Sequence, residues 1–325
     1  MSILIVSNRS DLPTNEIIGI INNKGHQVLR LNTEELCTGI NVVMRIEDSI
    51  FTPTLHYGTR TINLCDLKSA FYWRPEKPSQ SHIEDLEARE FAEAECSIFM
   101  SWIWQTLPCF WVNQPSLIRR AESKIDQLRI APSLGFNIPK TLITNQPDAI
   151  REFYRECNGD IVNKVLAKGV VKINDATYAI YTHRVEKRHM DDLDSVANTP
   201  CLFQERIEKV FELRITVVGD QVFAAEIHSQ MNARTKDDWR KYDFEHTPHK
   251  IHHLPRDVRA SCLGLLAHYG LHFGAIDMIV TPEGEYVFLE INPNGQWLWI
   301  ERLTGMPISE TLADMLIRSI GLTAA

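Results

Sequence analysis

The sequence predicts a mixed α/β (α+β) protein whose first part contains a parallel sheet and whose last part contains an antiparallel sheet. In the first third, short apolar strands alternate with helices, which is typical of parallel sheets. In the last third, apolar strands follow one another through tight turns, which is typical of hairpins. With 325 residues, 44% of them hydrophobic, the chain is long enough for two or three domains with buried cores.

The first part of the chain has the pattern of one α/β unit that ends near Gln114-Pro115. Apolar residues at helical spacing predict helices at 15–23 and 84–105. The longer helix carries acids on one face and a set of apolar residues on the other, namely Phe91, Ala94, Ile98 and Trp102. Short apolar runs predict strands at 3–6, 27–31, 70–73 and 110–113.

The remaining two thirds of the chain alternate between helices and strands, with Gly and Pro marking most of the turns. Apolar spacing predicts helices at 116–134, 186–196, 257–269 and 309–319. Runs rich in β-branched and aromatic residues predict strands at 160–166, 178–182, 201–205, 211–218 and 221–228, and a final hairpin at 273–292.

The final hairpin is the most informative stretch, because each of its two apolar strands carries an acid. A symmetric two- or four-residue turn would pair Asp277 directly with Glu290, and Asn292 would share the face of Glu290. Pro282 to Gly284 would also suit a three-residue bulged turn. That turn would place the two acids on opposite faces unless a second bulge corrected the register.

Two carboxylates that face each other repel, so this pairing predicts a bound cation between them. Oxygen ligands favour Mg²⁺, and Mg²⁺ with few carboxylates usually binds phosphates as well. The alternative is an edge hairpin with two solvated acids. The apolar neighbours of these acids argue against it, namely Ile276, Met278, Leu289 and Ile291.

Composition excludes several other classes of function. The formal net charge of −8 gives no global electrostatic reason to bind nucleic acid or an anionic membrane. No secretory signal and no apolar segment long enough to span a bilayer is visible. The seven scattered cysteines fit a reducing compartment, so we expect a cytoplasmic protein.

Several motifs resemble, in order and spacing, those of the ATP-grasp ligases. They are Lys124, Lys164, Gln204-Glu205-Arg206-Ile207, Glu212-Leu213-Arg214, and Asp277 followed by Glu290-Ile291-Asn292. The resemblance covers essentially the whole chain. Within this superfamily, further segments resemble the microviridin-type (graspetide) ligases that mature ribosomal peptides, namely Tyr72-Trp73-Arg74, Ser229-Gln230, Asp238-Trp239-Arg240 and 292–297.

The resemblance implies an ATP-grasp fold with three parts. These are an N-terminal pre-ATP-grasp α/β domain (1–114), a central subdomain with a leader-binding helix (115–204), and a C-terminal antiparallel-sheet subdomain with a metal site (205–325). It also implies an ATP-dependent macrocyclase that phosphorylates Asp or Glu side chains of a ribosomal precursor peptide. The enzyme would then join them to Ser/Thr hydroxyls as ω-esters or to Lys amines as ω-amides.

The same resemblance implies a role for each motif residue. Asp277, Glu290 and Asn292 would bind two Mg²⁺ ions. Lys124 and Lys164 would reach the ATP phosphates, although Lys124 alone could equally be a solvated helix lysine. Gln204, Glu205, Arg206 and Ile207 would form the adenine hinge, and Glu212 would contact the ribose or order nearby cations. Arg214 would stabilise the developing charge of the acyl-phosphate, its alternative being an exposed strand arginine.

Less specific segments are assigned by position alone. Arg240 would hold the substrate carboxylate and Asn294 would order phosphate or substrate, a solvated loop residue being the alternative for each. The helix with Asp191, Asp192 and Ser195 would bind the leader peptide, its alternative being a solvated acidic face. The expected flap after Lys164 is short, because that segment offers only Lys168-Gly169.

Two other functions stay open from the sequence. One is a ligase of the same fold that adds free amino acids to a protein terminus or a small molecule, and the other is a non-catalytic nucleotide-binding scaffold. The sequence identifies neither the general base nor the nucleophile. The family resemblance also implies a homodimer.

Overall fold

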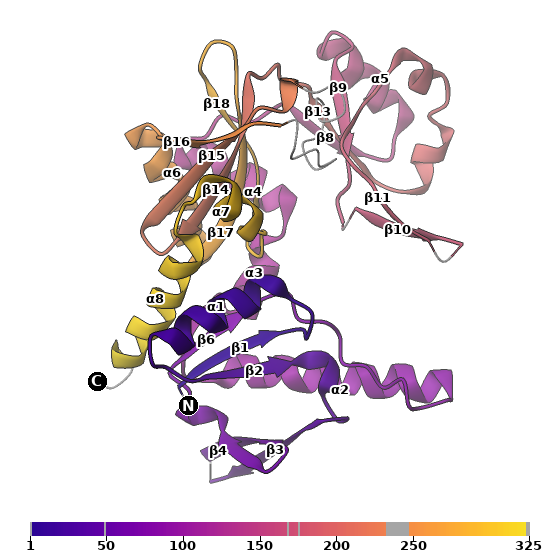
Figure 1. Cartoon of the computed structure of the whole chain (residues 1–325). Coiled ribbons are helices and arrows are strands. Elements are labelled where there is room, and N and C mark those ends of the chain that lie inside the picture. Colours follow the sequence, from indigo (N-terminus) through magenta and orange to yellow (C-terminus); the bar gives the residue numbers. More distant parts are fainter. Residues whose placement is uncertain (1, 49, 168, 175, 232–246, 323–325) are drawn as a thin grey trace.

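A computed structural model describes residues 2–48, 50–167, 169–174, 176–231 and 247–322. The chain forms three parts, each built around its own sheet (Figure 1). The N-terminal part lies at the bottom of the view, and the C-terminal sheet and the central part lie above it, side by side.

The N-terminal part contains the predicted parallel sheet, in the order β2-β1-β6-β7. The four predicted strands of this region are confirmed to within about two residues at each end. Helix α1 packs on the sheet together with the last helix of the chain. The elements are β1 (Ile3–Ser7), α1 (Leu12–Asn23), β2 (Val28–Asn32), β6 (Ser69–Tyr72), α2 (Leu86–Thr106) and β7 (Phe110–Val112).

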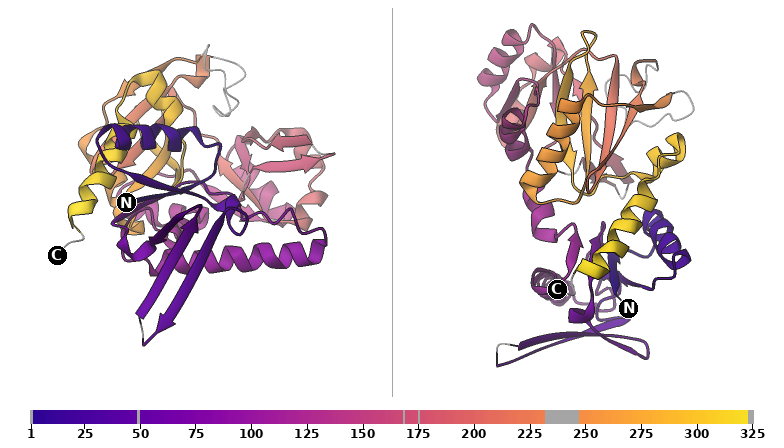
Figure 2. Two further views of the ribbon diagram at one scale, coloured as in Figure 1. Left: turned by 60° about the horizontal axis from the view of Figure 1, so that its bottom comes forward. Right: turned by 90° about the vertical axis from the view of Figure 1, so that its left-hand side faces the viewer.

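An antiparallel arm between β2 and β6 was not predicted. It consists of β3 (Ile40–Glu47), β4 (Ile50–Tyr57) and β5 (Arg60–Asn63), and it projects from the body of the molecule (Figure 2). Two 3₁₀ turns, Thr33–Glu35 and Leu64–Asp66, flank it.

Helix α2 has the predicted length, but the apolar face expected to pack is exposed. Phe91 is 69% exposed and Trp102 is 58% exposed. The helix instead buries Met100, Ile103 and Trp104 against the N-terminal core. Its outer half extends past the N-terminal sheet, and no helix or strand of the described residues lies over it (Figure 1).

Between the N-terminal and central sheets, the predicted helix 116–134 is broken into three pieces. These are α3 (Pro115–Ala121), α4 (Lys124–Ile130) and a 3₁₀ turn, Ala131–Leu134. The break comes at Ser123, whose hydroxyl accepts a hydrogen bond from the Asp126 amide (3.4 Å) and so starts a new helix. Gly135 ends the last turn in the left-handed region, as its position predicts.

The central part is an antiparallel sheet in the order β12-β9-β13-β8. Its elements are β8 (Thr141–Thr144), α5 (Pro147–Glu156), β9 (Ile161–Lys164), β12 (His183–Arg184) and β13 (Cys201–Glu205). Two predictions are wrong here. The expected strand 178–182 is replaced by a hairpin, β10 (Val170–Ile173) with β11 (Ala176–Ala179), which forms a longer flap than the sequence suggested. The expected helix 186–196 is two 3₁₀ turns, Lys187–Asp191 and Asp194–Asn198.

The C-terminal part is a five-stranded antiparallel sheet in the order β16-β15-β14-β17-β18. Helix α6 covers one face of the sheet, and α7, α8 and α1 pack against the opposite face. The elements are β14 (Phe211–Val218), β15 (Gln221–Ile227), a 3₁₀ turn (Ser229–Met231), β16 (His249–His252), α6 (Arg256–Tyr269), β17 (Phe273–Val280), β18 (Tyr286–Asn292), α7 (Leu298–Thr304) and α8 (Ile308–Leu322).

An aromatic cluster and one asparagine join the N-terminal sheet to the C-terminal sheet. Trp73 and Trp297 are both fully buried, with ring centroids 4.4 Å apart, and Phe273 packs edge-on against both. The buried Asn113 side chain accepts from the amides of His272 and Phe273 and donates to the Phe273 and Pro293 carbonyls. These contacts fix the end of β7 against the start of β17.

Within the described part of the chain, no helix combines the length and the apolar character needed to cross a membrane.

Candidate active site

The two acids of the final hairpin face each other because two irregularities in the hairpin cancel. The turn is the three-residue form, since the Gly284 amide donates to the Thr281 carbonyl (2.9 Å) and the Thr281 amide donates to the Glu285 carbonyl (3.0 Å). A second bulge at Leu289 then shifts the register by one. Asp277 therefore pairs with Glu290, as predicted. The pairing arises from a three-residue turn and a second bulge rather than from a symmetric turn.

Cationic side chains balance both acids. The guanidinium Nη1 of Arg214 lies 3.0 and 3.1 Å from the two carboxylate oxygens of Asp277, and both side chains are buried. Lys124 forms an ion pair with Glu290 from the start of α4. Because Arg214, Asp277 and Glu290 are cross-strand partners, they form one row across β14, β17 and β18.

Gln127 holds the lysine-bearing helix against the hairpin, and the sequence analysis missed this residue. Its side-chain amide donates to the Ile291 carbonyl (2.9 Å) and accepts from the Ile291 amide (3.0 Å). The buried glutamine thus takes the place of a neighbouring strand at the edge of β18. Lys124 lies one turn earlier on the same helix, so this contact also positions Lys124 beside Glu290.

Gly295 leaves room for Arg214. A Cβ atom at this position would lie 2.4 Å from the Ala275 Cβ and 2.6 Å from Arg214 Nη2. The same Nη2 donates to the Gln296 carbonyl (3.1 Å). The loop after β18 therefore packs directly on the arginine, and only glycine fits there without displacing it.

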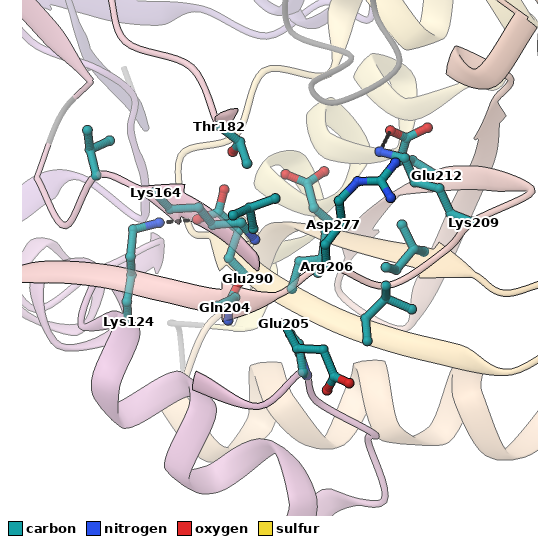
Figure 3. Close-up of a pocket in the computed structure, with 16 residues that line it drawn as sticks. Lys124, Lys164, Thr182, Gln204, Glu205, Arg206, Lys209, Glu212, Asp277 and Glu290 are labelled. Atoms are coloured by element: carbon teal, nitrogen blue, oxygen red, sulfur yellow. Dashed lines mark hydrogen bonds and ion pairs between the residues drawn. The ribbon is translucent and has the colours of Figure 1, made fainter. Parts of the chain in front are cut away.

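A pocket opens between the central sheet and the C-terminal sheet beside this row (Figure 3). Lys124, Lys164 and Glu290 lie toward one end of it, Lys209 and Glu212 lie toward the other, and Asp277 lies between them. The rest of the lining includes Pro139, Val162, Val165, Thr182, Gln204, Glu205, Arg206, Ile207, Ile279 and Leu289. Apolar walls with a few converging charges are typical of a site for a nucleotide.

Glu212 is a buried acid at the second end of the pocket. Burial raises its pKa, while the Lys209 ammonium (2.6 Å) and the Ser229 hydroxyl oppose that shift. Ser229 was singled out from the sequence only as part of a family-like segment, and Lys209 and Thr182 were not singled out as site residues. Thr182 follows the hairpin that was itself missed, and Lys209 lies in the loop before β14, where a lysine is normally solvated.

The donor set around Asp277 and Glu290 fits a cation that shares its ligands with phosphates. Two carboxylates lie on facing strands, and no group of three or more His, Cys, Asp or Glu side chains within the described ranges could enclose a metal alone. Mg²⁺ usually keeps one or two carboxylates and takes substrate phosphates for the rest. Asn292 lies in the next row on the same face, but it is exposed, and its side-chain oxygen accepts from the Asn294 amide (3.0 Å).

The structure brings together most, but not all, of the residues predicted for the site. Asn294 lies in the loop after β18 and is not among the pocket-lining residues, and Arg240 falls outside the described residues. Asp191 and Ser195 are exposed on the two 3₁₀ turns of the central part, Asp192 is exposed between those turns, and all three lie outside the pocket. The roles proposed for all of these residues stay predictions.

Comparisons with known proteins agree with this geometry. Residues 2–119 match the family model of the MvdD pre-ATP grasp domain. A RiPP-associated ATP-grasp ligase of Chryseobacterium gregarium, solved with ADP and a leader and core peptide, is 32% identical over 98% of this chain and 97% of that one, with a TM-score of 0.91. The macrocyclase MdnC of Microcystis aeruginosa MRC, solved with its precursor peptide MdnA, is 30% identical over 98% of this chain and 100% of that one, with a TM-score of 0.87.

Curated relatives are more distant. A probable alpha-L-glutamate ligase of Shewanella loihica is 23% identical over 66% of this chain and 69% of its own length. Fold and similarity together define an ATP-grasp ligase, an ATP-dependent enzyme that forms ADP. More narrowly, the chain belongs to the RiPP-associated ATP-grasp ligases.

We expect Gly295→Ala to lower the rate of ADP formation about 100-fold, because a displacement of about 1 Å at a reacting centre costs that much. The added methyl group would displace Arg214 from Asp277. Gly264→Ala in α6 is the matched control, because its Cβ would meet only Leu134 Cδ2 at 3.7 Å. Equal activity of the two variants, with both folded by circular dichroism, would contradict the proposed role of this close approach.

Proposed function

We propose that this enzyme is a peptide macrocyclase that activates Asp or Glu side chains of a ribosomally made precursor with ATP. The activated side chains are then joined to Ser/Thr hydroxyls as ω-esters or to Lys amines as ω-amides. The row of Arg214, Asp277 and Glu290, which borders the pocket, carries this proposal. Similarity to two ligases solved with precursor peptides supports the choice of substrate.

The pocket supplies contacts for each part of ATP. The adenine lies against the end of β13, where Gln204 to Ile207 offer backbone groups and Val162 and Val165 offer an apolar wall. Glu212 accepts hydrogen bonds from the ribose. Lys124 and Lys164 neutralise the phosphates as point charges.

Asp277, Glu290 and Asn292 would hold two Mg²⁺ ions, which would supply positive charge to balance the γ-phosphoryl group. Arg214, which Asp277 holds in place, stabilises the charge of the phosphorylated carboxylate and the tetrahedral charge when the nucleophile attacks. Arg240 and Asn294 orient the substrate carboxylate and its phosphate. The attacking oxygen or nitrogen forms the new bond to the acyl carbon, and inorganic phosphate leaves.

The test is co-expression with short acidic precursor peptides, followed by intact mass measurement. We expect the loss of one water per bond formed, and no loss with Asp277→Asn, because that variant lacks the charge that holds both Arg214 and Mg²⁺. Asp220→Asn, in the exposed turn between β14 and β15, is the matched control and should stay active. Mild base then separates esters from amides.

Two results would overturn this proposal in different directions. An unchanged peptide mass with ATP turnover on free amino acids would favour the second function, ligation of amino acids, to which the glutamate ligase relatives point. If the protein binds nucleotide but releases no phosphate with any candidate substrate, the result would favour the third function, a non-catalytic nucleotide-binding scaffold.

We infer that the leader segment of the precursor binds beside Asp191, Asp192 and Ser195. These residues are exposed on or between two 3₁₀ turns, which pack on α5 through Met190, Leu193 and Val196. The apolar side of these turns is packed against α5, and their Asp side chains are exposed. An exposed acidic surface of this kind suits a peptide that carries Arg or Lys.

Replacing both Asp191 and Asp192 by Asn should weaken leader binding roughly tenfold, because two exposed ion pairs together contribute about 1–2 kcal/mol. Titration of a fluorescent leader peptide measures the affinity. Asp194→Asn is the matched control, because Asp194 is also exposed on these turns. A loss of affinity that is equal for Asp194→Asn would mean that only the general negative charge matters.

We also infer a homodimer that buries the apolar stripe of α2, namely Phe91, Ile98 and Trp102. These three side chains are 42–69% exposed on one helix that projects from the body of the molecule. Exposed aromatic side chains on one continuous face are typical of protein interfaces.

Phe91→Glu together with Trp102→Glu should convert a dimer to a monomer in light scattering, because each buried charge costs more than the interface gains. Ile46→Glu is the control, since that residue is 72% exposed on β3, in the arm that projects from the body of the molecule. A monomeric wild-type chain at micromolar concentration would exclude this dimer.

A further inference from the structure

Two of the seven cysteines lie in direct contact on the N-terminal part, far from the nucleotide pocket. The Sγ atoms of Cys37 and Cys96 are 3.5 Å apart. Cys37 lies in the turn before β3 and is exposed, and Cys96 lies on α2 and is partly buried. The pair therefore combines a thiol that small molecules can reach with one that is held behind it.

The surrounding contacts fix the two thiols toward each other. The Gln80 side chain is buried, and its Nε2 donates to the Leu36 carbonyl (3.0 Å) and to Cys96 Sγ (3.7 Å). The Gln80 amide also donates to Glu93 on α2 (3.0 Å). The Gln80 side chain is thus hydrogen-bonded both to Leu36, the residue before Cys37, and to the thiol of Cys96.

The backbone at Cys37 gives a second, independent observation. Its φ is +65°, a left-handed conformation that cysteine rarely adopts and that glycine or asparagine would adopt at lower cost. The Cys37 amide donates to the Ile40 carbonyl (2.8 Å), which closes the turn. The turn directs the Cys37 side chain at α2 despite the conformational energy that a positive φ costs. Strained backbone conformations of this kind are commonest at functional residues.

We propose that Cys37 and Cys96 form a reversible disulfide when the protein meets a low-molecular-weight disulfide such as oxidised glutathione. The Cys37 thiolate attacks one glutathione sulfur, forms a mixed disulfide and releases one glutathione. The Cys96 thiolate then attacks the Cys37 sulfur and releases the second glutathione. The protein loses two thiol protons and two electrons, and oxidised glutathione takes up both to become two molecules of glutathione.

The environment of Cys96 makes the second step the slow one. Burial raises the pKa of the Cys96 thiol, and the nearby Glu93 and Glu95 carboxylates raise it further, and both causes persist when Cys37 carries glutathione. Because only the thiolate attacks, the rate of ring closure should rise about tenfold for each pH unit between pH 7 and 9.

The bond would restrain α2 at the point where the helix leaves the body. Cys96 packs against the N-terminal core, whereas most of the apolar side chains before it on α2 point into solvent. The link would close a loop of about 60 residues, so the thermal midpoint of the full chain should rise by roughly 5 °C on oxidation. If the proposed dimer exists, oxidation would also fix the helix that carries its interface. That consequence alone rests on the proposed function.

The experiment treats the full-length protein with oxidised glutathione at pH 8, alkylates the remaining thiols and maps the peptides by mass. We expect a crosslink between Cys37 and Cys96 and alkylation of the other five cysteines. Cys96→Ser should stop at a glutathione adduct on Cys37, and Cys37→Ser should leave Cys96 unmodified. Cys65→Ser, at another partly buried cysteine, is the control that keeps the crosslink.

Two outcomes would overturn the proposal. One is a wild-type protein that keeps glutathione on Cys37 without closing the ring, and the other is a Cys37 thiol that does not react. Both readouts are independent of precursor, ATP and dimer, so a failure here and a failure of the proposed macrocyclase can be told apart.

Discussion

Asp277 and Glu290 face each other across β17 and β18, and the rest of the site is arranged to make that placement stable. Facing carboxylates in a buried sheet repel, so each needs a cation nearby. Arg214 comes from the next strand, and Lys124 comes from a helix that Gln127 fastens to the sheet edge. Gly295 leaves room for the arginine. The repulsion between two acids thereby determines which residues can occupy four other positions.

Local patterns predicted most of the elements, because strands and helices here obey their hydrophobic periods. The parallel N-terminal strands and the five-stranded C-terminal sheet need only such patterns. The acids of the final hairpin were also visible, since an acid inside an apolar strand is costly unless it has a partner. Even their pairing was predicted, although through two cancelling bulges rather than a symmetric turn.

What the sequence could not supply depends on contacts between distant segments. Gln127 looks like any helix glutamine until Ile291, which is distant in the sequence, presents an unpaired strand edge. Gly295 is informative only once Arg214 and Ala275 are placed around it. The helical period of α2 identified an apolar face correctly but not whether this chain buries it. The 3₁₀ turns near Asp191 replace a helix because packing of Leu193 against α5 overrides local propensity.

The ion pairs also bear on the order in which ligands enter. Lys124 and Arg214 form ion pairs with Glu290 and Asp277, respectively. If a triphosphate binds here as proposed, it would compete with Glu290 for the Lys124 ammonium. Mg²⁺ would then supply positive charge beside Glu290. Nucleotide and metal should therefore bind with positive coupling, and the coupling must be equal in both directions. On this account the paired acids and bases link binding of ATP to assembly of the metal site.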